Sequence, residues 1–241
     1  MVPLKTFVRK LFHRVGYDFH RLIPEMNPSF QINQGLERFG IDLVFDVGAN
    51  AGQFGKDLRS MGYRGRIVSF EPLSSAHAQL VQAARGDAAW SVHQRCAVGD
   101  RDGAVTINVA GNSVSSSLLP MTQAHETAAR SSAYVGTEQV PLARLDNVVG
   151  AYLTGARAPF LKIDTQGFEW AVLDGAPMLL PSLRGVLCEL SLVHLYEGQH
   201  LWLDVIHRLE TEGLRTWAVQ PGFTDQRDGR TLQLDAIFFR T

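Results

Sequence analysis

The stretch FDVGANAGQF, residues 45–54, decides the fold class of this chain of 241 residues. An apolar run, an acid and two glycines around an asparagine predict a strand, a tight turn and the start of a helix. α/β proteins use that arrangement to present backbone N–H groups to nucleotide-like ligands. The turn departs from the G-x-G-x-x-G pattern of dinucleotide sites, because Asn50 and Gln53 replace the second and third glycines. A side chain at Asn50 would obstruct a pyrophosphate.

Outside this stretch, strand and helix patterns alternate along the chain, which indicates a parallel sheet covered on both faces. The expected strands span 43–47, 66–72, 91–100, 160–164 and 185–192, and the expected helices span 53–61, 74–84, 145–153, 168–180 and 201–212. Residues 214–220 and 232–240 are expected to form a terminal antiparallel hairpin. Residues 104–110 are predicted to pair with the third strand, and 111–136 to form a long lid or binding loop.

The first 28 residues are predicted to be a helical appendage to one domain over residues 29–241. Apolar residues recur at helical spacing over 2–15 with basic residues between them, which predicts a basic amphipathic helix. We expect it to pack on the domain or on a second subunit, as in a homodimer; the alternative is peripheral contact with an anionic membrane surface. A further helix over 29–39 is expected, with Ser29 as its N-cap and Gly40 at its end.

Composition and charge restrict the class of partner and the compartment. The chain has 23 Lys and Arg against 24 Asp and Glu, a formal charge of −1, so no nucleic-acid partner is expected. Cys96 and Cys188 lie in apolar runs and are interpreted as reduced core residues. The sequence shows no apolar stretch of about 18 residues and no signal-peptide pattern, so a cytoplasmic protein is expected.

The residues around the first turn suit S-adenosylmethionine better than a dinucleotide. Asp46 ends a strand where a carboxylate could accept from a cationic amine, and Gly48 and Gly52 permit close backbone approach. About 20 residues further on, Glu71 ends the second strand, where it could accept both ribose hydroxyls. The alternative is that these residues only form the turn and the strand ends.

Several motifs occur together in a characteristic order: FDVGANAGQF, IVSFEP, AVGD, SSSLL, FLKIDTQGFEWAVLDGA and CELSLVHLYEGQ. In this order the chain resembles the FkbM family of S-adenosylmethionine-dependent O-methyltransferases from about Leu43 to Tyr196. The resemblance implies an α/β fold, the class I methyltransferase (Rossmann-like) seven-stranded sheet with helices on both faces and a C-terminal antiparallel hairpin. It also implies the cofactor-binding residues Asp46, Gly48, Asn50, Gly52, Glu71, Pro72, Cys96, Ala97 and Asp164, with Cys96 and Ala97 beside the adenine.

An alcohol needs a base or a cation to withdraw its proton before methylation. Asp164, Glu189 and His194 fall at or just beyond strand ends, and we expect them to converge on the acceptor. His194 is predicted to be the base, while the two acids orient the acceptor or bind Mg²⁺ or Mn²⁺. The alternatives are a helix cap, a structurally paired carboxylate and a surface histidine.

Ser115, Ser116, Ser117 and Gln166 are candidate substrate contacts, unless the serines belong to an ordinary polar loop. The favoured function is methyl transfer to a hydroxyl, and the resemblance implies an acceptor sugar in a glycan, glycolipid or glycosylated natural product. The alternatives are an NAD-dependent dehydrogenase on a similar sheet and a non-catalytic cofactor-binding or scaffold protein.

Overall fold

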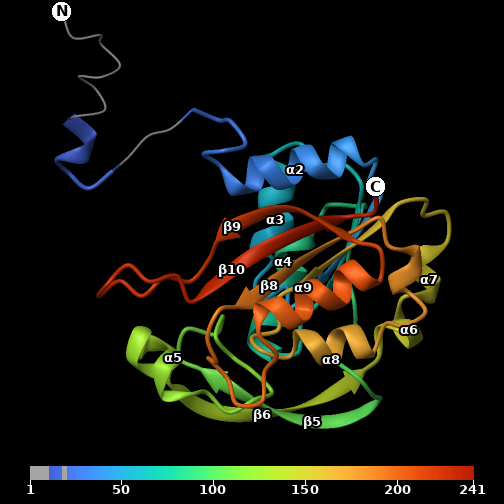
Figure 1. Cartoon of the computed structure of the whole chain (residues 1–241). Helices are drawn as coiled ribbons and strands as arrows, with labels where there is room; N and C mark the ends of the chain where they lie inside the picture. The colour runs from blue at the N-terminus through green and yellow to red at the C-terminus, as the bar shows by residue number, and fades with distance from the viewer. Residues whose placement is uncertain (1–10, 18–20) are drawn as a thin grey trace, which may run out of the picture.

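A seven-stranded sheet forms the centre of the computed structural model, which describes residues 11–17 and 21–241 (Figure 1). Its strand order is β3-β2-β1-β7-β8-β10-β9, with β10 antiparallel to both neighbours and the first five strands parallel. The strands are β1 (Leu43–Val47), β2 (Arg66–Phe70), β3 (Trp90–Val92), β7 (Pro159–Ile163), β8 (Gly185–Ser191), β9 (Arg215–Pro221) and β10 (Gln233–Phe239). This order and the closing β9–β10 hairpin confirm the predicted sheet.

Helices cover both faces of this sheet. One face packs on α2 (Pro28–Arg38), α3 (Gln53–Ser60) and α4 (Ser74–Ala84). The other face packs on α6 (Leu145–Val148), α7 (Gly150–Leu153), α8 (Glu169–Asp174) and α9 (Trp202–Thr211). Because both faces are covered, every residue of β1 and β7 is buried, as continuous strands in a doubly covered parallel sheet require.

A second sheet lies beyond the main one, at the bottom of Figure 1, and it corrects two sequence-based predictions. It consists of β4 (Ala97–Val98), β6 (Tyr134–Ala143) and β5 (Gly103–Ala110), in that order. The predicted strand 91–100 is therefore split: Trp90–Val92 belongs to the main sheet as β3, and Ala97–Val98 belongs to the second sheet as β4. Between them, Arg95 pairs with Glu138 of β6. β5 pairs with β6 rather than with the third strand.

The segment expected to be a long loop, 111–136, contains regular structure. It includes α5 (Gln123–Ala128), the short 3-10 helix η1 (Arg130–Ser132) and the start of β6. The helix predicted over 168–180 is also shorter, because α8 ends at Asp174 and Pro177 cannot continue it. A 3-10 helix, η2 (Leu180–Ser182), follows.

The first long helix, α2, has its N-cap two residues earlier than predicted. Asn27 is its N-cap, since the Asn27 Oδ1 accepts a hydrogen bond from the Phe30 N–H at 2.8 Å, and Ser29 lies within the first turn. Gly40 follows the helix with φ +65°, as expected. Most of the amphipathic helix predicted over 2–15 falls on residues 1–10, outside the described residues.

Two further sequence-based predictions concern the cysteines and the membrane. Cys96 and Cys188 are both buried free thiols, as predicted. Across residues 11–17 and 21–241, no helix combines the length and the apolar character needed to cross a bilayer.

Candidate functional site

The turn after β1 adopts a backbone that glycine makes possible. Gly48, Asn50 and Gly52 all have left-handed φ angles, of 76°, 45° and 82°. A Cβ added to Gly48 would lie 1.8 Å from the carbonyl oxygen of Asp164, so only glycine lets this turn approach the end of β7. The Asn50 Oδ1 accepts a hydrogen bond from the Ala51 N–H at 2.8 Å, which folds the side chain back onto the turn.

Glu71 follows β2 and is held by the backbone on both carboxylate oxygens. Its Oε2 accepts from the Asn50 N–H at 2.8 Å and its Oε1 from the Leu73 N–H at 2.9 Å. The side chain is only 4% exposed, and burial raises the pKa of Glu71 to about 7. A carboxylate has about four acceptor positions, so both oxygens can still accept from a ligand diol.

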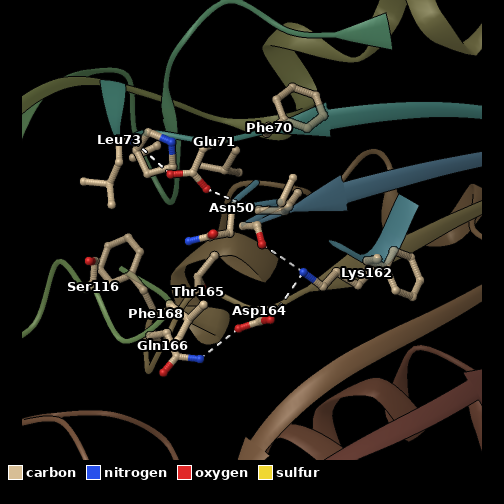
Figure 2. A pocket seen from close by; sticks show the side chains of 18 of the residues that line it. Asn50, Phe70, Glu71, Leu73, Ser116, Lys162, Asp164, Thr165, Gln166 and Phe168 are labelled. Atoms are coloured by element: carbon tan, nitrogen blue, oxygen red, sulfur yellow. Dashed lines mark hydrogen bonds and ion pairs between the residues drawn. The ribbon is translucent and has the colours of Figure 1, made fainter. Parts of the chain in front are cut away.

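A cavity of about 350 Å³ opens over the turn and Glu71 (Figure 2). One end is an apolar slot lined by Leu73, Cys96, Val98, Ile107 and Phe168. The other end lies beneath α2 and α3 and is lined by Ile32, Phe54, Asp57, Leu187 and Asp235. Of the predicted cofactor residues, Gly48, Asn50, Glu71, Pro72, Cys96, Ala97 and Asp164 line this cavity. Gly52 is buried at the start of α3, where a Cβ would lie 3.1 Å from both Leu80 and Ala83.

Lys162 on β7 contacts the end of β1, and it was not predicted from the sequence as a site residue. Its Nζ donates to the Gly48 carbonyl oxygen at 2.9 Å and lies 3.2 Å from Asp46 Oδ1 and 3.4 Å from Asp164 Oδ2. Burial lowers the pKa of this amine, but the charges of Asp164 and Asp46 outweigh burial and hold the pKa above its usual value. The lysine inside the apolar run FLKID could have indicated this contact, because a buried ammonium requires a charged or hydrogen-bonding partner.

Asp46 lies beneath the cavity rather than on its wall. It is fully buried, and its Oδ2 accepts from the Ser69 hydroxyl at 3.2 Å. The Ser69 oxygen in turn accepts from the indole N–H of Trp90 at 3.0 Å. The structure thus places the Asp46 carboxylate against Lys162, and its predicted role toward a cofactor amine stays a prediction.

The structure brings Asp164, Gln166 and Glu189 together. Gln166 has a left-handed φ of 54°, and its Nε2 donates to Asp164 Oδ1 at 2.9 Å and to Glu189 Oε2 at 2.5 Å. The Gln166 Oε1 accepts from the Tyr196 hydroxyl at 2.8 Å. Gln166 lines the cavity, whereas Glu189 does not. Burial and the nearby charge of Asp164 raise the pKa of Glu189 well above its usual value.

His194 does not join this group. Its side chain is exposed on the loop after β8 and does not line the cavity, and its carbonyl oxygen accepts from the Thr122 hydroxyl at 2.9 Å. Within the described part of the chain, no group of three or more His, Cys, Asp or Glu side chains is arranged to hold a metal ion. Metal binding by Asp164 and Glu189 therefore stays a prediction.

Of the three candidate serines, only Ser116 lines the cavity. Ser117 is buried and donates from its hydroxyl to the Gln166 carbonyl oxygen at 2.6 Å, which anchors the loop after β5 to the turn after β7. The buried Ser115 accepts from the Asn112 side-chain amide at 3.0 Å. Ser115 and Ser117 are therefore buried next to the cavity wall without lining the cavity.

Asp235 on β10 is a second site residue that was not predicted from the sequence. It lies directly opposite Glu189 in the β8–β10 register and lines the cavity beside Lys162. Its half-buried carboxylate accepts no hydrogen bond from any described residue. Burial and the charge of Asp164 raise the pKa of Asp235 to about 6. An acid within the apolar run LQLDAIFF could have indicated such a residue, because a carboxylate is unusual in a buried strand.

The model of the "Methyltransferase FkbM domain" matches residues 46–216. The chain belongs to the FkbM methyltransferase family. Membership and the sheet order together support methyl transfer from S-adenosylmethionine, and the family assignment disfavours the dehydrogenase alternative. No curated protein matches this FkbM chain.

Among solved structures, the chain is similar to Aeropyrum pernix fibrillarin with natively bound S-adenosyl-L-methionine, at 12% identity and a TM-score of 0.45, over 83% of this chain and 66% of that one. It is similar to a TehB-like SAM-dependent methyltransferase from Corynebacterium glutamicum, at 11% identity and a TM-score of 0.42, over 98% and 97%. It is also similar to the mitomycin 7-O-methyltransferase MmcR, at 10% identity and a TM-score of 0.46, over 88% and 53%.

Glu71→Ala is expected to weaken binding of S-adenosylhomocysteine about 10-fold to 100-fold, because the ribose diol loses a charged acceptor worth about 1.5–3 kcal/mol. Isothermal titration calorimetry measures the change. Glu126→Ala is the matched control, since Glu126 is exposed on α5 and does not line the cavity. Equal affinities for Glu71→Ala and the unmodified protein would contradict the ribose assignment.

Proposed function

We propose that this FkbM methyltransferase transfers the methyl group of S-adenosylmethionine to a hydroxyl of an acceptor that contains a sugar, in a glycan, a glycolipid or a glycosylated natural product. The observation that carries the proposal is one continuous cavity, which is lined by the carboxylate of Glu71 and also by the acids Asp164 and Asp235. Hydroxyl groups are the donors that such carboxylates bind.

The residues at the first end fit the methyl donor. Glu71 would hold the ribose, and the slot between Leu73 and Phe168 offers an apolar space for the adenine. The turn at Gly48 would receive the methionine part. The bound donor supplies an electrophilic methyl group on a sulfonium. The protein's contribution is to hold the acceptor oxygen in line with that methyl group and to exclude water.

The charge of the cavity supports a neutral acceptor over a polyanion. Its lining carries the acids Asp57, Glu71, Asp164 and Asp235 and, within the described residues, one amine, that of Lys162. This excess of negative charge repels phosphate groups, which is consistent with the expectation that nucleic acid is not a partner. A saccharide without phosphate groups is not repelled in this way.

The test uses S-adenosylmethionine with an isotopically labelled methyl group. The protein is incubated with it and with a small-molecule and glycolipid extract from the source cells, and mass spectrometry identifies the labelled product. We expect a labelled methyl ether on a sugar. Label on nitrogen, carbon or a nucleic acid would contradict the proposal. A protein that binds the donor but labels nothing in any fraction would favour the scaffold alternative.

A further inference from the structure

The two ends of the cavity come from different parts of the chain. The turn after β1, Glu71 and the apolar slot all lie within residues 46–216, the segment that matches the family domain. At the other end, Ile32 comes from α2 and Asp235 from β10, and both lie outside that segment. The end of the cavity that would hold the acceptor is thus completed by Ile32 and Asp235, which lie outside the segment matched by the family domain.

The carboxylates around the cavity differ in how much of each is already engaged. Glu71 accepts a backbone N–H on each oxygen. Asp164 accepts from Gln166 on Oδ1, and its Oδ2 lies 3.4 Å from the Lys162 ammonium. Glu189 stands outside the lining, and its Oε2 accepts from the side-chain amides of Gln166 and Gln233. All three carboxylates therefore serve the protein's own hydrogen bonds.

Asp235 differs from these three. It lines the cavity, and the described residues provide no hydrogen-bond donor to its carboxylate. Because no described residue donates to it, its oxygens keep their acceptor positions free for a hydroxyl group bound in the cavity. Asp57 also lines the cavity without a side-chain hydrogen bond, but it is exposed on α3 and water can solvate it.

The register of the sheet fixes where Asp235 points. Directly opposed residues of an antiparallel pair lie on one face, so Asp235 shares the face of Glu189. On that face, Leu187, two residues before Glu189, packs with residues of α2 and α3 in one apolar cluster. The Lys162 Nζ lies on the same side, 5.7 Å from the centre of the Phe54 ring. Asp235 therefore faces the chamber under α2 and α3, beside the end of β7.

We propose that Asp235 is a catalytic residue that binds the acceptor hydroxyl and takes its proton during methyl transfer, in the chamber walled by Ile32, Phe54 and Leu187. This inference rests on the proposed hydroxyl methylation. The acceptor oxygen forms a bond to the methyl carbon, and the bond from that carbon to sulfur breaks with its electron pair left on sulfur. The hydroxyl proton passes to the Asp235 carboxylate and then to water. The products are a methyl ether and S-adenosylhomocysteine.

The chamber also indicates which acceptors fit. Its walls are apolar on the side of Ile32 and Leu187 and aromatic at Phe54, with carboxylates at Asp57 and Asp235. A sugar ring presents a C–H face and hydroxyl edges, which match an apolar wall and a carboxylate. Acceptors with a carboxylate or phosphate next to the reacting hydroxyl would be repelled by Asp57 and Asp235.

The test is Asp235→Asn, compared with the unmodified protein and with Asp228→Asn. The amide keeps the size of the side chain but cannot take a proton. Asp228 lies on the exposed turn of the same β9–β10 hairpin, away from the cavity, so this variant controls for the loss of an acid. The assays are labelled methyl transfer to the acceptor in the cell extract, isothermal titration with S-adenosylhomocysteine, and thermal unfolding.

We expect Asp235→Asn to lower turnover by about 10²–10⁴-fold, the usual scale for loss of a general base, with unchanged affinity for S-adenosylhomocysteine and an undiminished melting temperature. Asp228→Asn should retain full turnover. Turnover within about threefold of normal for Asp235→Asn would overturn the inference while methyl ethers still form. Label on nitrogen or carbon in the unmodified protein would instead overturn the proposed function, and with it the role of Asp235 toward a hydroxyl.

Discussion

Gly48→Ala is expected to abolish measurable binding of S-adenosylhomocysteine and to lower the free energy of unfolding by more than about 3 kcal/mol. The new Cβ would lie 1.8 Å from the Asp164 carbonyl oxygen, so the turn after β1 and the end of β7 must separate. That separation also removes the Gly48 carbonyl oxygen from the Lys162 ammonium. Urea unfolding and isothermal titration measure the two losses.

Gly62→Ala is the matched control for this substitution. Gly62 has a φ of 100°, but nothing lies within 4 Å of the position of its Cβ. The control therefore includes only the backbone cost of a left-handed alanine, about 1–2 kcal/mol, and should keep normal affinity for S-adenosylhomocysteine. Similar losses of stability for the two variants would show that the close approach to Asp164 has no special importance.

Lys162→Met is expected to lower the free energy of unfolding by about 3–5 kcal/mol, the usual cost of leaving a buried charge without its partner. Asp46 is fully buried, and its Oδ1 has Lys162 as its charged neighbour at 3.2 Å. Methionine preserves the apolar stem but provides no charge. Urea unfolding followed by circular dichroism gives the value.

A double variant separates the lost pair from lost packing. Lys162→Met combined with Asp46→Asn removes both charges, and it should recover most of the stability, because replacing both partners costs far less than replacing one. Lys56→Met, on the exposed face of α3, should change stability by about 0.5 kcal/mol or less. If the double variant is no more stable than Lys162→Met, the charge pair does not explain the loss.

Local sequence signals predicted the elements that depend on local chemistry. The apolar run at Leu43–Val47 gave β1, and the helix Ser74–Ala84 was predicted with its observed bounds. Gly40 follows its helix as predicted. The terminal hairpin followed from two apolar runs around a polar turn. In each case the residues that determine the element lie within it or next to it.

The remaining features depend on neighbours that are distant in sequence. An isolated lysine in FLKID shows that a partner is needed, but Asp46 is that partner only because β1 lies beside β7. Asp235 faces the cavity because of its register with Glu189. His194 was expected at the site because it follows a strand end, yet a loop can leave that edge within a few residues, and its side chain is exposed. The same reasoning placed Asp164 at the cavity correctly, because Asp164 directly follows the last residue of β7.

The adjacency of β1 and β7 also has a consequence for how the protein folds. Val47 pairs with Ile163, a separation of 163 − 47 = 116 residues, so the central strand pair requires the closure of a very long loop. Contacts between such distant residues form slowly, because chain entropy must be lost before they stabilise the fold. We therefore expect the site around Gly48, Lys162 and Asp164 to form late in folding. A nascent chain that has not yet emerged past β7 gains no stability from bound nucleoside, since the ligand stabilises only a state in which its site exists.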